Sequence, residues 1–215
     1  MRLEQRYKEF IRYFSENMPE VKTELEYEND YQLLVAVVLS AQCTDKRVNA
    51  TTPLLFKHFP DINALSKASF ESLSLIIKSI SYPNNKSKNL ISMAKILMET
   101  HKGLIPKSVE ELVKLPGVGR KTANVLTSVL YNQPNMPVDT HVFRVSNRIG
   151  LTNNSKTPLE TEKVLTKHIP KSIIPKAHHW LILHGRYVCK ARRPNCSKCG
   201  IKHVCKYYSS LEAEK

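Results

Sequence analysis

Apolar residues recur along most of this chain at spacings of three and four, the period of an α-helix with one buried face. Residues 3–17 show this period first and predict an amphipathic helix. Residues 31–41 are apolar on every side, and their length favours a buried helix over a buried strand. No sustained alternation of apolar and polar residues indicates a strand, and no internal repeat is present. The pattern therefore predicts an all-α fold.

Helix-capping signals mark further elements in the second half of the chain. Ser108 and Glu111 have the spacing of a capping box. A helix is expected over about residues 120–131, ending before the turn-rich sequence NQPNMP, which is the best candidate for a domain boundary or crossing point. Asp139 can cap the next helix, THVFRVSNRI, whose end is marked by a glycine.

Charge is the unusual feature of the composition. The 33 Lys and Arg residues exceed the 19 Asp and Glu residues, which gives a net charge of +14. An excess of this size indicates a polyanionic partner, most often nucleic acid. The first ten residues lack the apolar stretch of an export signal, and the longest apolar run, residues 33–39, is too short to cross a bilayer. We therefore expect no membrane association and a reducing compartment, where cysteines rarely form disulfides.

Four of the five cysteines lie within 17 residues. Their pattern is C-x6-C-x2-C-x5-C, formed by Cys189, Cys196, Cys199 and Cys205. Four thiolates so close in sequence can bind zinc or an iron–sulfur cluster, and the spacing alone leaves both open. Basic residues surround them, including Arg192 and Arg193 between the first two cysteines, and cations held in this loop can face phosphate. The fifth cysteine, Cys43, is expected to be a small core or cleft residue.

The sequence LPGVGRKTA at residues 115–123 has the character of a helix–hairpin–helix. Gly117 and Gly119 allow a tight turn and present backbone N–H groups at the start of the second helix, which suits a phosphate oxygen. Such a grip recognises the DNA backbone and not its base sequence. Lys121 lies in the first turn of that helix, where the helix dipole and Arg120 disfavour its protonated form. These residues alone leave Lys121 either a nucleophile or a phosphate contact.

Several motifs together resemble the endonuclease III family of DNA glycosylases. They are LSAQCTD, LPGVGRKTANVL, PVDTHVFRVSNR and HHWLILHGRYVC, followed by the four-cysteine pattern, in the family's order. The resemblance implies a helical barrel domain over residues 22–133, with its helix–hairpin–helix at about 108–131. It also implies an iron–sulfur domain formed by residues 1–21 and 134–215, with the cluster loop at 189–205. DNA is expected to bind in the cleft between the two domains.

The same resemblance assigns roles to individual residues. Lys121 is expected to be the nucleophile and Asp139 the catalytic carboxylate, and the four cysteines are expected to hold one [4Fe–4S] cluster, which decides the metal question in favour of iron. Gln42 is expected to enter the gap left by a flipped base. The full set of expected DNA contacts is Gln42, Asp45, Tyr82, Leu115, Gly117, Val118, Gly119, Arg120, Arg192 and Arg193.

The implied activity is that of a bifunctional DNA glycosylase and AP lyase. It removes oxidised pyrimidines from double-stranded DNA and cleaves the strand 3′ to the abasic site by β-elimination. We expect a monomer that acts on chromosomal DNA in the cytoplasm. Two positions depart from the family pattern: Tyr82 stands where the family often has a leucine that wedges into the duplex, and Val113 where some relatives have a glutamate. We therefore expect Tyr82 to be the wedge.

Two other functions compete with this interpretation. An adenine-mismatch glycosylase shares the fold and the cluster and can use an aromatic residue at the Tyr82 position. Such relatives usually lack a lysine at the position of Lys121 and carry an additional C-terminal domain. A non-catalytic DNA-binding module with a structural metal is the other alternative, and it predicts no cleavage of abasic DNA.

Overall fold

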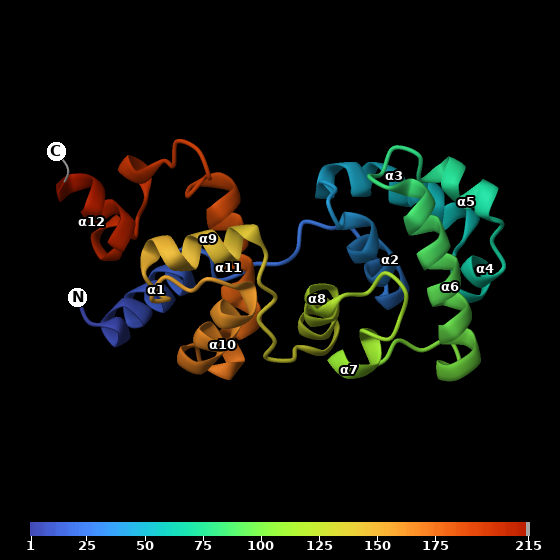
Figure 1. The fold of residues 1–215 in the computed structure, drawn as a ribbon, viewed down its shortest axis with the longest axis horizontal. Coiled ribbons are helices and arrows are strands. Elements are labelled where there is room, and N and C mark those ends of the chain that lie inside the picture. Colours follow the sequence, from blue (N-terminus) through green and yellow to red (C-terminus); the bar gives the residue numbers. More distant parts are fainter. Residues whose placement is uncertain (214–215) are drawn as a thin grey trace. The chain divides into compact units, whose positions relative to one another are not determined.

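The computed structural model describes residues 1–213, and its regular structure is helical, with no strand in this part of the chain (Figure 1). The chain divides into two units, described separately below. Unit 1 comprises Met1–Lys22 and Asn132–Lys215, and unit 2 comprises Thr23–Tyr131. The chain thus returns to unit 1 at the start of the NQPNMP sequence. No helix within the described residues is long and apolar enough to cross a membrane.

Unit 2 is built around one helix that is buried on every side. This helix, α2, carries eight buried residues among its eleven, including Leu33, Leu34 and Leu39, and it packs against α3, α6 and α8. Asn29 caps its start by accepting a hydrogen bond from the backbone N–H of Gln32 at 3.0 Å. The helices of this unit are α2 (Asp30–Ser40), α3 (Asp45–His58), α4 (Ile62–Ser66), α5 (Phe70–Ile76), α6 (Pro83–His101), α7 (Val109–Leu112) and α8 (Arg120–Tyr131).

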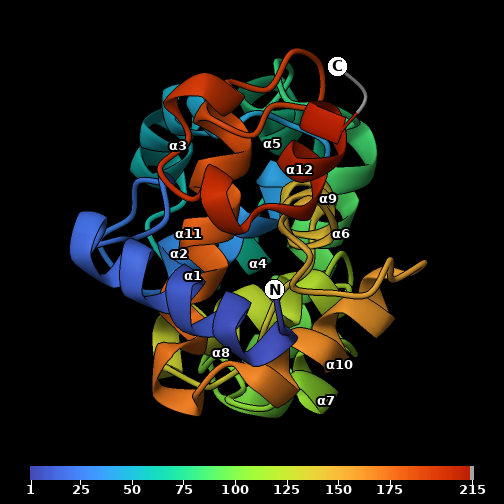
Figure 2. The same ribbon diagram turned by 90° about the vertical axis from the view of Figure 1, so that its left-hand side faces the viewer.

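Unit 1 has an aromatic core. Trp180 on α11 stacks on Phe14 of α1, with ring centroids 5.8 Å apart, and Phe10 meets the edge of the same indole. α11 therefore lies beside α1, and it also packs on α9 (Figures 1 and 2). The helices of unit 1 are α1 (Leu3–Asn17), α9 (Thr140–Ile149), α10 (Pro158–His168), η1 (Lys171–Ile173), α11 (Ile174–Tyr187), η2 (Cys196–Lys198), η3 (Lys202–Val204) and α12 (Lys206–Ala213), where η marks a 3-10 helix.

The structure confirms the helices predicted from periodicity and capping. Residues 3–17, 120–131 and 140–149 are helical over the expected ranges, and the predicted helix at 31–41 begins and ends one residue earlier. The Ser108 hydroxyl accepts the backbone N–H of Glu111 at 3.2 Å, which is one of the two bonds of a capping box, while the Glu111 carboxylate accepts a bond from Lys114 at 2.6 Å. Its helix, α7, has only four residues, so the hairpin begins directly after a single turn.

Candidate functional site

The hairpin at residues 115–119 contains a β-turn with proline and glycine at its centre. The Val118 N–H donates to the Leu115 carbonyl at 3.1 Å, and Gly117 has φ of 80°. Pro116 followed by a residue with positive φ is the sequence of a type II turn, for which glycine is strongly preferred at the second central position. An added Cβ at Gly117 would also stand 3.1 Å from the Asn89 Cβ. Gly117 is therefore required by the turn itself.

Gly119 has a different environment from Gly117. Its φ is not positive, and nothing lies within 4 Å of the position that a Cβ would take. Its carbonyl accepts the N–H of Ala123 at 2.9 Å, so α8 begins here. The turn does not need this glycine, contrary to the expectation that both glycines permit the tight turn. The absent side chain leaves the backbone at the start of α8 open to a ligand.

Lys121 is exposed in the first turn of α8, next to the exposed Arg120. The two apolar residues of the hairpin point the other way. Leu115 and Val118 are 2 % and 5 % exposed and belong to the core of unit 2. Any contact of these two residues with DNA would therefore be made by their backbone.

Asp139 caps α9, as the sequence predicted. Its Oδ1 accepts the backbone N–H groups of His141 at 2.9 Å and Val142 at 2.8 Å. The residue is half-buried and follows the buried Val138. Two hydrogen bonds to the helix start hold the carboxylate in one orientation, which an electrostatic role in a reaction also needs.

The four clustered cysteines line one cavity in unit 1. Cys189 follows α11, Cys196 opens η2, Cys199 follows η2, and Cys205 follows η3. The rest of the lining includes Ile149, Val188, Pro194 and Ile201. All four thiols are free of disulfides, and within residues 1–213 no group of three or more His, Cys, Asp or Glu is arranged to hold a metal ion. The result is a shared, largely apolar cavity with sulfur donors from three short segments.

Burial and hydrogen bonding act on these thiols in opposite directions. Burial raises the pKa of the Cys199 and Cys205 thiols, although backbone N–H groups favour their charged forms. The Arg148 guanidinium lies 3.6 Å from the Cys189 sulfur, and the His184 Nε2 lies 3.7 Å from the Cys199 sulfur. Metal ligation would supply the positive charge that makes these thiols ionise.

The loop between Cys189 and Cys196 is held by α9. Arg148 donates to the carbonyls of Lys190 at 2.7 Å and Ala191 at 3.0 Å, and Arg144 donates to the carbonyl of Cys189 at 3.2 Å. Arg192 and Arg193, the expected DNA contacts in this loop, are exposed in its middle, directly after Ala191. Arg144 and Arg148 were not predicted from the sequence. Their spacing of four on a predicted helix, which places them on one face, was the available signal.

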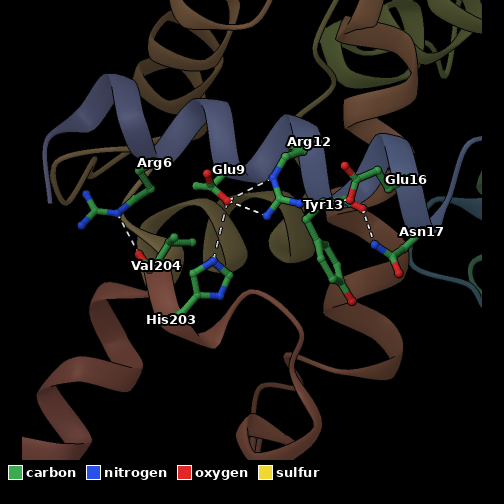
Figure 3. Close-up of polar contacts among 8 residues, drawn as sticks. All are labelled: Arg6, Glu9, Arg12, Tyr13, Glu16, Asn17, His203 and Val204. Carbon is green, nitrogen blue, oxygen red and sulfur yellow. Dashed lines mark hydrogen bonds and ion pairs between the residues drawn. The ribbon is translucent and has the colours of Figure 1, made fainter.

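The N-terminal helix supports the second half of the cysteine segment (Figure 3). The Arg6 Nε donates to the Val204 carbonyl at 2.9 Å, and the Glu9 carboxylate lies 3.8 Å from His203. The Tyr13 ring occupies the position that a Cβ at Gly200 would take. Residues at opposite ends of the chain thus pack together around the cysteines.

Gln42 and Tyr82 line a second cavity, which lies within unit 2. Its volume is about 410 Å³, and Asn85, Lys86 and Gly117 also line it. Both Gln42 and Tyr82 are exposed, Tyr82 to 63 %, and both have left-handed backbones, with φ of 55° and 58°. Only the family resemblance predicts that Gln42 and Tyr82 contact the same DNA.

Asp45 differs from the other expected DNA contacts, because its position has a local explanation. It is half-buried and begins α3, where a carboxylate suits the positive end of the helix dipole. Thr44 precedes it as the N-cap. The helix start thus gives Asp45 a local role, and its contact with DNA stays a prediction.

Comparison with known proteins gives the family. A model of the HhH-GPD superfamily of base excision DNA repair proteins matches residues 35–171. Endonuclease III of Rickettsia felis is 50 % identical over 197 residues, covering 92 % of this chain and 92 % of that protein. Endonuclease III of Escherichia coli (strain K12) is 40 % identical over 204 residues, covering 95 % and 96 %.

Solved structures agree with these relatives. A trapped covalent intermediate of endonuclease III and DNA, an estranged-adenine complex, matches with a TM-score of 0.92 and 40 % identity, covering 99 % of this chain and 100 % of that chain. A non-covalent endonuclease III–DNA complex matches with a TM-score of 0.93 and 39 % identity, over the same shares of the two chains. This chain therefore belongs to the HhH-GPD superfamily of base excision DNA repair proteins and, within it, to the endonuclease III family.

Proposed function

We propose that this protein is a bifunctional DNA glycosylase and AP lyase that removes oxidised pyrimidines from duplex DNA. The observation that carries the proposal is the position of Lys121. This exposed amine lies in the first turn of α8, directly after a hairpin with open backbone at Gly119. The similarity to endonuclease III, including a covalent complex of that protein with DNA, supports the same conclusion.

The hairpin is the proposed grip on the DNA backbone. The N–H groups in the first turn of a helix lack carbonyl partners four residues earlier, and the helix dipole adds positive potential. A phosphate oxygen can accept hydrogen bonds from these N–H groups, and its negative charge is attracted by the positive potential. With the phosphate held at Gly119, the Lys121 amine would lie at a fixed distance from the sugar of a nucleotide flipped out of the stack.

Lys121 is the proposed nucleophile. A base stacked in the duplex cannot be reached, so the damaged nucleotide must first be flipped out. The Lys121 amine attacks C1′, and the base leaves with the electron pair of its glycosidic bond and gains a proton. The bound nitrogen loses its proton as the sugar ring opens, which gives an imine. Loss of a proton from C2′ then expels the 3′ phosphate, which is the β-elimination.

Asp139 is the proposed catalytic carboxylate. Positive charge develops at the sugar as the base leaves, and a carboxylate held in one orientation stabilises it. The two backbone hydrogen bonds to Oδ1 provide that orientation. Its cap of α9 and its role in the reaction are therefore compatible.

We also propose that Cys189, Cys196, Cys199 and Cys205 hold one [4Fe–4S] cluster. Four thiols around one cavity are the donor set that such clusters take. The Arg148 guanidinium near the Cys189 sulfur and the basic residues of the loop would offset the negative charge of the ligated cluster. The cluster would hold residues 189–205 together and so keep Arg192 and Arg193 in place on the DNA side.

Borohydride trapping tests this proposal. Borohydride reduces an imine to a stable bond, so the protein mixed with DNA that carries one abasic site should become covalently attached to it. Lys121→Gln should bind the same DNA and form no adduct. If Lys121→Gln forms the adduct as fast as wild type, another amine is the nucleophile.

Borohydride trapping and a base-release assay together separate the competing functions. A non-catalytic DNA-binding module would form no adduct in the wild-type protein. An adenine-mismatch glycosylase would release adenine from a mismatch and leave an oxidised pyrimidine in place. We propose that the protein works as a monomer on chromosomal DNA in the cytoplasm, and its similarity to bacterial endonuclease III supports the action on DNA.

A further inference from the structure

Lys86 is a buried lysine whose ammonium group binds backbone carbonyls instead of a carboxylate. It lies in the first turns of α6 and is 7 % exposed. Its Nζ donates to the Leu39 carbonyl at 2.8 Å and to the Ala41 carbonyl at 2.6 Å. A buried ammonium group is costly unless it is hydrogen-bonded, so these two contacts are the reason it is tolerated there.

The two carbonyls belong to the end of α2, where the helix leaves its last acceptors without backbone partners. The ammonium group therefore takes the place of a C-terminal cap and complements the negative end of the helix dipole. The neighbouring carbonyls accept hydrogen bonds from residues nearby in sequence. The Val37 carbonyl accepts one from the Ser40 hydroxyl at 2.8 Å, and the Val38 carbonyl accepts one from the Ala41 N–H at 3.5 Å. The Ser40 carbonyl accepts one from the Cys43 N–H at 3.0 Å.

Lys86 also contacts the segment that carries Tyr82. Its own backbone N–H donates to the Tyr82 carbonyl at 3.1 Å. The bond to Tyr82 is the ordinary backbone bond at the start of α6, whereas the bonds of the ammonium group are specific to lysine. The Lys86 side chain thus attaches the carbonyl directly before Gln42 to the helix start at Tyr82, 40 positions further along the sequence. Gln42 and Tyr82 are the exposed side chains that line the cavity in unit 2.

The backbone at both positions needs such support. Gln42 and Tyr82 have φ of 55° and 58°, a conformation that costs a residue with a side chain free energy and persists only where neighbouring contacts impose it. Burial lowers the pKa of Lys86, which agrees with an ammonium group enclosed by protein and not by solvent.

We propose that Lys86 is a positioning residue that holds Gln42 and Tyr82 as a preformed pair for insertion into the duplex at the lesion. This inference rests on the proposed function, because it concerns how the same protein binds lesion DNA. A preformed pair is ordered before binding, so the complex does not lose that freedom when it forms. Without the ammonium group, the Gln42 segment would lose its attachment beside Tyr82, and the pair would be ordered only on contact with DNA.

The test compares two duplexes, one undamaged and one with a reduced abasic site that cannot be cleaved. Lys86→Met keeps most of the side-chain volume and removes the hydrogen bonds. We expect about a tenfold loss of affinity for the abasic duplex relative to the undamaged one, the factor that ordering two side chains would produce. Lys86→Arg, which keeps the charge and the donors, should recover part of that preference.

Lys95→Met is the matched control, since Lys95 is exposed on the same helix. It removes one positive charge and should weaken binding to both duplexes equally. Equal weakening of both duplexes by Lys86→Met would overturn the proposal and leave Lys86 a purely structural residue. Should Lys86→Met fail to fold, Lys86→Gln retains an N–H donor and is judged by the same ratio of affinities.

A second variant tests whether Lys86 acts through Gln42. In a Gln42→Ala background, Lys86→Met should reduce the preference for abasic DNA by less than it does in wild type, because half of the inserted pair is already missing. Full additivity of the two losses would contradict the inference.

Single-stranded abasic DNA separates this inference from the proposed function. It has no stack to fill, so its borohydride adduct should form equally fast with wild type and Lys86→Met. A wild-type protein that forms no adduct with abasic duplex DNA would refute the proposed function, whereas an adduct with an unchanged preference between duplexes in Lys86→Met would refute only the role of Lys86.

Discussion

The two units hold their functional segments by different means. In unit 2, the turn at Gly117 and the ammonium group of Lys86 fix the hairpin and the Gln42 loop with protein atoms alone. In unit 1, residues 189–205 contain only short 3-10 turns, and Arg148 and Arg6 bind them at the edges of a cavity lined by four thiols. Unit 2 therefore obtains its geometry from packing, whereas unit 1 needs the group that we propose between its sulfurs.

The variant with the largest expected effect disorders the cysteine segment of unit 1 and leaves unit 2 folded. Cys199→Ala removes one proposed cluster ligand, and ligation free energy contributes directly to folding when no site exists in the unfolded chain. Iron content should fall, and hydrogen exchange should accelerate over residues 189–213 while α2, α6 and α8 stay protected. Cys43→Ala is the matched control, since Cys43 packs against the core of unit 2 outside the cavity. Full protection of residues 189–213 in an iron-free protein would contradict the comparison.

The next effect separates the two roles of Asp139. Asparagine is as good an N-cap as aspartate, so Asp139→Asn should keep the stability of α9 and slow base release by about 10²–10³-fold, through loss of the carboxylate charge. Asp139→Ala should slow base release to the same extent. It should also destabilise the protein by about 1 kcal/mol, because alanine cannot cap the helix. Single-turnover base release and thermal unfolding measure the two quantities. Equal base release in Asp139→Asn and wild type would leave Asp139 a helix cap only.

The two glycines of the hairpin provide a sharper test within unit 2. Gly117→Ala should destabilise the protein by more than about 1 kcal/mol, because alanine is strained at φ of 80° and its Cβ would press on Asn89. Gly119→Ala has room for its methyl group, so stability should be unchanged while binding to undamaged DNA weakens. Chemical denaturation and DNA binding distinguish them. If Gly119→Ala is stable and binds DNA as well as wild type does, the phosphate does not bind at Gly119.

The smallest effect concerns the surface of unit 1 beside the cysteine segment. The hydrogen bond from Arg12 lowers the pKa of Glu9, with smaller contributions from the charges of Arg12 and His203 (Figure 3). The contribution of Glu9 to stability is therefore present above the usual carboxylate pKa and is lost as the pH falls through the lowered value. Glu9→Gln should change stability only slightly at pH 7, since exposed ion pairs contribute little. Unfolding measured against pH checks this, and Arg12→Met should remove most of this pH dependence, leaving the smaller contribution of His203.

Helices with strong local signals were predictable from the sequence. The period in residues 3–17, the turn-rich sequence after residue 131 and the cap at Asp139 mark helices through nearby residues, and the structure has helices there. The fully apolar stretch at 31–41 was less determined, because periodicity cannot distinguish a buried helix from a buried strand.

The candidate site was predictable to a smaller extent. The spacing of the cysteines and the order of the motifs identified Lys121, Asp139 and the four thiols as candidates, and these assignments stay predictions. The supports beneath them could not be predicted, since Lys86 binds carbonyls 45 and 47 positions away and Arg148 binds carbonyls 42 and 43 positions away. A lysine or arginine in sequence gives no sign of which carbonyl it will meet.

The sequence by itself determined the helices, the turn at Pro116–Gly117, the basic character and the set of sulfur donors, because each depends on residue type and short-range spacing. Only the tertiary structure decided that Leu115 and Val118 are buried, that Gly119 stands in open space, and that Lys86 joins the segments of Gln42 and Tyr82. These outcomes depend on which distant backbone groups packing brings within hydrogen-bond distance. Burial and hydrogen-bond partners are properties of the folded chain and not of any short segment of it.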